Sequence, residues 1–172
     1  MVDAVTLQSR LGVAGRQCPL TPCCLAAPAC GVGQSHIYTG NEDGTIDRWR
    51  CDTQDLTARW AAHSPLATTA LAIISVPKEC LGLSDFDVPV LVSGASDGEV
   101  RLWIQPAACW GAQFSVGDAE LPSRITGLSA SMRLVDSEAF SIDCVATLAN
   151  GDIWLLDLFP GTHPMQLVSR AL

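Results

Sequence analysis

The sequence predicts an all-β protein built from three repeated units. Three hairpins recur along the 172-residue chain, and their turn glycines, Gly44, Gly98 and Gly151, are spaced 54 and 53 residues apart. Each turn carries Asp-Gly or Asn-Gly, dipeptides that tolerate the positive φ of a two-residue hairpin turn. In the clearest hairpin, 91–103, the flanking residues are apolar or β-branched and the second arm alternates with period two. A near-constant period of this kind indicates a repeat architecture.

The first two hairpins also share side chains at fixed offsets: a hydroxyl residue, an Asp four residues later and a Trp ten residues later. They are Thr39, Asp43 and Trp49 in the first hairpin and Ser93, Asp97 and Trp103 in the second. His63 precedes the second hairpin, and the first repeat has no matching His. In the third hairpin the same positions hold Ala146, Asn150 and Leu156. The second repeat is therefore the most complete.

This pattern resembles the WD-repeat β-propeller family, in which each repeat forms a four-stranded blade. In that family a His, a Ser or Thr, an Asp and a Trp form a buried hydrogen-bonded tetrad. The resemblance implies a structural tetrad of His63, Ser93, Asp97 and Trp103, in which Asp97 accepts a hydrogen bond from His63. It also implies a partial tetrad in the first repeat, formed by Thr39, Asp43 and Trp49. The implied role is structural and not catalytic.

The resemblance further implies one partial propeller domain of three four-stranded blades. Blade 1 is expected at about 16–62, blade 2 at about 63–117 and blade 3 at about 118–172, with an extra N-terminal strand at 4–10. Three prolines (Pro19, Pro22 and Pro28) interrupt the first strand of blade 1. The segment 165–169 is expected to be the fourth strand of blade 3.

A ring of three blades does not close, because closed propellers have about four to eight blades. An open arc exposes the side faces of its end blades, which is an aggregation hazard. We therefore expect an incomplete or oligomer-completed ring. The chain is part of a longer propeller, or it associates with a second copy of itself, or another subunit completes it.

The bulk composition narrows the class of partner. A net charge of −8 argues against nucleic acid, because affinity for phosphates depends on Lys and Arg. With 48% hydrophobic and 16% charged residues the chain is too apolar to be disordered. The apolar stretch 66–76 is too short to span a bilayer, and residues 1–4 do not begin a secretory signal. We expect a cytoplasmic or nuclear protein that does not bind membranes.

The cysteines and the His–Ser–Asp set each admit a second interpretation. The eight cysteines lack paired Cys-x-x-Cys spacing, so we expect reduced thiols and neither metal nor cofactor. A metal site formed by Cys18, Cys23, Cys24 and Cys30 is the alternative.

Ser93, His63 and Asp97 also have the residue types of a hydrolase triad, but Ser93 lies within an expected strand and not on a Gly-x-Ser-x-Gly elbow. A β-sandwich with chance hairpin similarity is a further alternative fold.

The segment 77–89 is a long, partly acidic insertion that carries Glu79, Asp85 and Asp87. Inserted loops lie on the surface and often determine binding, so this is a candidate partner-binding loop; the alternative is an insertion without a role. The leading functional interpretation is a non-catalytic protein–protein interaction scaffold, a WD-repeat subunit of a larger complex. An enzyme on a propeller scaffold is the alternative.

Overall fold

The structure is a computed structural model that describes residues 21–27, 36–77, 88–104, 109–118, 121–134 and 140–158. All regular secondary structure in these residues is β-strand, which confirms the all-β fold class. The strands are β1 (Pro22–Ala26), β2 (His36–Asn41), β3 (Thr45–Arg50), β4 (Leu56–Ala61), β5 (Thr68–Val76), β6 (Val88–Ala95), β7 (Glu99–Ile104), β8 (Cys109–Ser115), β9 (Gly117–Asp118), β10 (Leu121–Pro122), β11 (Ile125–Leu134), β12 (Phe140–Leu148) and β13 (Ile153–Leu158).

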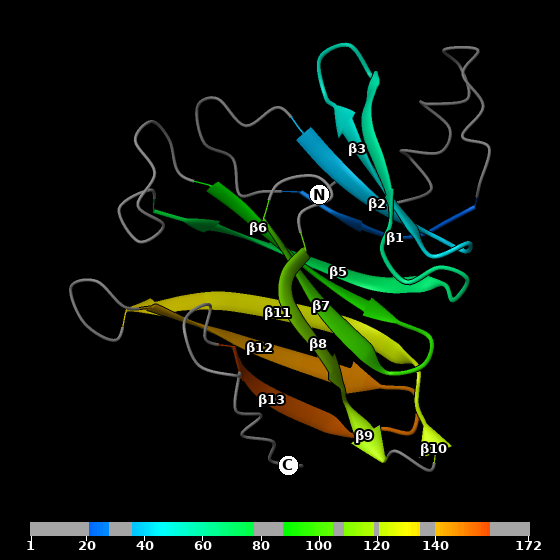
Figure 1. The fold of residues 1–172 in the computed structure, drawn as a ribbon, viewed down its shortest axis with the longest axis vertical. Coiled ribbons are helices and arrows are strands. Elements are labelled where there is room, and N and C mark those ends of the chain that lie inside the picture. The colour runs from blue at the N-terminus through cyan, green and yellow to red at the C-terminus, as the bar shows by residue number, and fades with distance from the viewer. Residues whose placement is uncertain are drawn as a thin grey trace.

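The strands form antiparallel sheets whose neighbours are consecutive in sequence. Blade 1 has the order β1-β2-β3-β4, blade 2 has β5-β6-β7-β8, and the described part of blade 3 has β11-β12-β13. The short strands β9 and β10, which the sequence did not predict, pair with each other. The expected strands at 4–10 and 165–169 lie outside the described residues. Figure 1 shows the blades one beside another, from β1–β4 at the top to β11–β13 at the bottom.

The blades pack through alternate faces of their sheets. The first strand of blade 2, β5, contacts both β1 and β11. On β6, Leu91 belongs to the core shared with blade 1, whereas Val90 and Val92 belong to the core shared with blade 3. Because side chains alternate across a strand, each blade has one face toward the preceding blade and one toward the following blade. Polar residues on one face of a blade therefore contact only one of the two neighbouring blades.

The hairpin turns tie each of the first two blades to the chain that follows it. Gly44, Gly98 and Gly151 have φ values of 77°, 84° and 94°, in the region that favours glycine. The linker after blade 1 lies over the first turn, where Gly44 O accepts hydrogen bonds from Ala62 N at 2.9 Å and His63 N at 2.8 Å. Gly98 O likewise accepts from the backbone N–H of residue 116 at 2.9 Å. The turn at Gly151 has open space at the corresponding place.

Candidate functional site

Three side chains of the expected tetrad form a hydrogen-bonded chain in blade 2, on the face toward blade 1. Trp103 on β7 donates its indole N–H to Ser93 Oγ on β6 at 2.8 Å, and Ser93 Oγ lies 2.8 Å from His63 Nε2 in the linker. All three side chains are buried. The Trp103 ring also packs against Trp60 of β4, with ring centroids 6.0 Å apart. The chain therefore connects the linker, the β6–β7 hairpin and the last strand of blade 1.

The carboxylate that meets His63 is Glu99 and not Asp97, which corrects the expectation from sequence. Glu99 Oε2 lies 3.2 Å from His63 Nδ1, whereas Asp97 Oδ1 accepts the backbone N–H of Glu99 at 3.1 Å. Asp97 stands in the turn, where its short side chain bonds the backbone two residues later, as Asx turns do. Glu99 begins β7, and it shares a face with Trp103 because the two are four residues apart on a strand.

Glu99 is also bound by Arg101, the residue between it and Trp103 on the same face. Arg101 Nη2 lies 2.8 Å from Glu99 Oε2, and Arg101 Nη1 donates to the carbonyl oxygen of Ala62. Burial lowers the pKa of His63, although the hydrogen bond to Glu99 opposes this shift. The neutral ring fits its partners, because Nδ1–H donates to the carboxylate and Nε2 accepts from Ser93. Both ring nitrogens of His63 are therefore satisfied without a charged imidazole.

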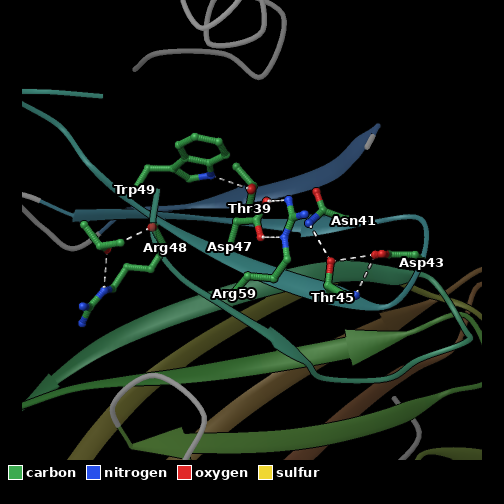
Figure 2. Close-up of polar contacts among 9 residues, drawn as sticks. Thr39, Asn41, Asp43, Thr45, Asp47, Arg48, Trp49 and Arg59 are labelled. Carbon is green, nitrogen blue, oxygen red and sulfur yellow. Dashed lines mark hydrogen bonds and ion pairs between the residues drawn. The ribbon is translucent and has the colours of Figure 1, made fainter. Parts of the chain in front are cut away.

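Blade 1 keeps only the hydroxyl–indole bond of the expected partial tetrad. Trp49 donates its indole N–H to Thr39 Oγ1 at 3.0 Å (Figure 2). Asp43 remains in the turn, where its Oδ1 accepts from the backbone N–H of Thr45 at 3.0 Å and from its hydroxyl at 2.6 Å. The structure thus joins Thr39 to Trp49 and leaves Asp43 with a local role in the hairpin.

An ion pair that sequence reasoning missed lies beside this bond. Arg59 on β4 binds Asp47 on β3 through two contacts, Nε to Oδ1 at 2.5 Å and Nη2 to Oδ2 at 2.6 Å (Figure 2). The two residues are opposite each other in the β3–β4 ladder, and the Asp47 side chain is fully buried. The sequence alone could have shown that a charged residue, two positions before Trp49, lies on the same face of β3. It could not have shown the partner of that residue, because the partner depends on the register of β4.

The arrangement in blade 2 does not suit nucleophilic chemistry. The Ser93 hydroxyl is fully buried and already engaged by Trp103 and His63, so no substrate carbonyl reaches it in this conformation. Asp97, the expected orienting acid, does not bond the imidazole; Glu99 does. These side chains act as a structural brace between the linker and the hairpin.

The remaining expected site residues are only partly described. Glu79, Asp85 and Asp87 lie outside the described residues, as do Cys18 and Cys30. Cys23 and Cys24 are free thiols on β1, and burial raises the pKa of Cys24 to about 12. Among the residues that the structure places, no group of three or more His, Cys, Asp or Glu side chains is arranged to hold a metal ion. The described part of the chain contains no helix that is long and apolar enough to cross a membrane.

Comparison with known proteins gives a likeness of fold alone. No family model matches the chain, and no curated protein matches it. Among 358 matching chains of solved structures is the β-propeller domain of Cps50 (Swd1) from Myceliophteria thermophila. The two share 17% sequence identity with a TM-score of 0.54, over 88% of this chain and 37% of the other. The chain therefore spans little more than a third of the propeller structure that it matches.

Proposed function

We propose that this chain, which folds as part of a WD-repeat-type β-propeller, is a non-catalytic scaffold that binds other proteins within a larger complex. The observation that carries the proposal is the use of His63, Ser93 and Trp103 in a buried brace. The residue types that a hydrolase would need are engaged in holding strands together. A rigid arc of blades then presents its loops and outer faces to partners. We place the protein in the cytoplasm or nucleus, without a cofactor.

The brace explains why such an arc can present a surface in a fixed position. Residues 62–66 of the linker are held by Gly44 O, by the Arg101 guanidinium and by Ser93 through His63. Three separate attachments on one short segment restrict the motion of blade 1 against blade 2. A preorganised surface loses less conformational entropy when a partner binds. This favours a binding role.

The acidic segment 78–87 is the proposed contact for a basic partner. It joins β5 to β6, two strands that the blade 2 core holds firmly. Loops on a rigid scaffold tolerate variation and commonly carry binding residues. Its carboxylates, Glu79, Asp85 and Asp87, contribute to the net charge of −8, which raises the rate of encounter with cationic surfaces.

The test is affinity capture from the native source with the wild-type chain, the double variant Asp85→Ala/Asp87→Ala and a matched control. The control, Glu42→Ala/Asp52→Ala, removes the same charge from exposed turns of blade 1. We expect a near-stoichiometric protein partner with the wild type and the control, and a several-fold weaker recovery with the loop variant. Equal recovery by all three chains would remove the loop from the interface. Recovery of no stoichiometric partner would contradict the scaffold function.

A further inference from the structure

The two outer faces of the arc differ in what covers them. On blade 1, the outward-facing Thr39, Asp47 and Trp49 are buried within the chain itself. On blade 3, the outward face of β12 and β13 exposes three apolar side chains: Val145 is 38%, Ile153 37% and Leu155 45% accessible. The outer face of blade 1 therefore buries these three side chains and exposes one large apolar residue, Leu56, at 42%, whereas the outer face of blade 3 exposes three.

These exposed residues occupy repeat positions that are buried in blade 2. Val145, Ile153 and Leu155 stand 53 residues after Val92, Val100 and Leu102, which are fully buried against blade 3. The turn shows the same difference. A Cβ on Gly44 or Gly98 would lie within 3 Å of the following linker's backbone, whereas a Cβ on Gly151 would meet nothing within 4 Å. The outer face of blade 3 thus has the character of an interface that the described residues leave uncovered.

The side chains on this face become larger from one edge of the sheet to the other. Ser129 on β11, Val145 on β12 and Leu155 on β13 are aligned by the strand register. Because neighbouring strands are about 4.8 Å apart, the small Ser129 and the large Leu155 are separated by about 10 Å across the sheet. A twofold axis parallel to β12 places β11 of one copy over β13 of the other. The side chain of Leu155 then lies over the partner subunit's Ser129.

One cation and two carboxylates also lie on this face. Arg133, near the end of β11, binds Asp143 at 3.1 Å and Asp157 of β13 at 3.2 Å, and its side chain is 50% accessible. The same twofold axis brings Arg133 toward the end of β13 that carries the partner subunit's Asp157. Half of the Arg133 side chain stays accessible beside its own two carboxylates, so its guanidinium can also reach the partner subunit's Asp157.

We propose that a second copy of this chain docks on the outer face of blade 3, as a twofold-symmetric dimer with the axis along β12. A head-to-tail ring would bury less apolar surface, because Thr39, Asp47 and Trp49 on the outer face of blade 1 are already buried and Leu56 is the large apolar residue exposed there. An interface that uses one patch on both copies is isologous, and such twofold dimers are the commonest homo-oligomers. This inference goes beyond the proposed function, which concerns other proteins, and neither depends on the other.

The size of the face predicts the strength of the dimer. A nine-residue strand is about 30 Å long and three strands are about 14 Å wide, which gives about 400 Å² for each copy. A stable interface buries about 800 Å² for each partner. We therefore expect a weak dimer whose population rises with protein concentration from the micromolar to the millimolar range.

The test is light scattering of the full chain over that concentration range, with two interface variants and one control. Leu155→Glu places a charge in the contact, and Ser129→Arg fills the position that receives Leu155. The control, Leu66→Glu, changes a leucine of similar exposure, 41%, in the linker between blades 1 and 2. We expect the wild type and Leu66→Glu to approach twice the monomer mass, and both interface variants to remain monomeric. Ser129 is exposed on the monomer, so its variant keeps the test valid if Leu155→Glu does not fold.

A double variant, Ser129→Cys/Leu155→Cys, tests the direction of the axis. Within one copy the two positions are too far apart for a disulfide, whose Cα atoms are at most about 7 Å apart. Oxidation is expected to yield a peptide that links position 129 of one copy to position 155 of the other. A disulfide between two copies of position 155 would overturn the proposed axis. A wild type that stays monomeric, a mass beyond the dimer, or dimerisation of both interface variants would overturn the proposal itself.

Discussion

Blades 1 and 2 hold a tryptophan by the same hydrogen bond, yet they compensate buried charge in different ways. In blade 1, Asp47 is paired with Arg59 across two neighbouring strands. In blade 2 the equivalent of Asp47 is Arg101, which binds Glu99 on its own strand and a carbonyl of the linker. The charge at this repeat position is therefore reversed between the blades.

The difference shows which part of the repeat is local and which is tertiary. Thr39 and Trp49, like Ser93 and Trp103, lie diagonally across one hairpin, so a fixed offset brings them together in both blades. Beyond this bond, Asp47 is bound by Arg59 of another strand, whereas the linker supplies His63 to Glu99 and a carbonyl oxygen to Arg101. The Glu99–Arg101 pair lies within β7 itself. Blade 1 is braced within its own sheet, whereas blade 2 is braced against the segment that joins the two blades. Four predictions, each with its own control or reference, test this contrast, and the largest effect is expected first.

Arg59→Met is expected to destabilise the protein by about 3–5 kcal/mol, because it leaves the Asp47 carboxylate buried and unpaired. The measurement is the free energy of unfolding from urea titration at low protein concentration. Arg133→Met is the matched control, since it removes an Arg from an exposed ion-pair cluster on blade 3 and should change stability far less. Equal effects of the two substitutions would show that burial of Asp47 does not matter.

Ser93→Ala leaves two buried groups without a hydrogen-bond partner, the Trp103 indole N–H and His63 Nε2. Each unpaired group is expected to lower the free energy of unfolding by about 1–3 kcal/mol. Thr39→Val orphans only the Trp49 indole N–H in blade 1 and should cost about half as much. Urea titration measures both losses of stability. The slope of the unfolding free energy against urea concentration should be the same in the wild type and in both variants. If the two variants were equally stable, the bond to His63 would contribute nothing to blade 2.

The brace of blade 2 is expected to make the stability of the protein depend on pH. Burial lowers the pKa of His63 below its ordinary value of 6.5, so below that pH the unfolded chain binds a proton that the folded chain resists. Stability should be full above about pH 7.5 and should fall by at most about 1.4 kcal/mol by about pH 5.5. His63→Gln should remove this part of the slope while retaining any contribution from His36. Parallel pH profiles for the two proteins would contradict the assignment.

Asp97→Ala is expected to have the smallest effect, about 0.5–1.5 kcal/mol, through loss of one turn hydrogen bond. Asp43→Ala in blade 1 should have a comparable effect, because Asp43 plays the same local role. Glu99→Ala serves as the reference, since it removes the carboxylate that binds both His63 and Arg101. Unfolding midpoints decide the order, and a larger loss for Asp97→Ala than for Glu99→Ala would restore Asp97 as the partner of His63.

The fold class and the principal hydrogen bonds follow from local sequence. Asp-Gly turns, β-branched arms and fixed offsets specify hairpins, and a hairpin defines the register that places Ser93 near Trp103. Strand ends were less predictable: the clearest hairpin was expected to span 91–103, whereas its two strands, β6 and β7, cover Val88–Ala95 and Glu99–Ile104. Pairing across the sheet extends a strand beyond its strongest propensity signal.

The sequence by itself therefore determined the repeat, its hairpins and the hydroxyl–tryptophan bonds, because these depend on residues within about ten positions of one another. Only the tertiary structure decided that Glu99 binds His63 in place of Asp97, that Asp47 is paired with Arg59, and that the face of Leu155 is open. Each of these depends on which strand, linker or neighbouring blade lies opposite a side chain. That neighbour is established by packing between distant segments, which a local pattern does not encode.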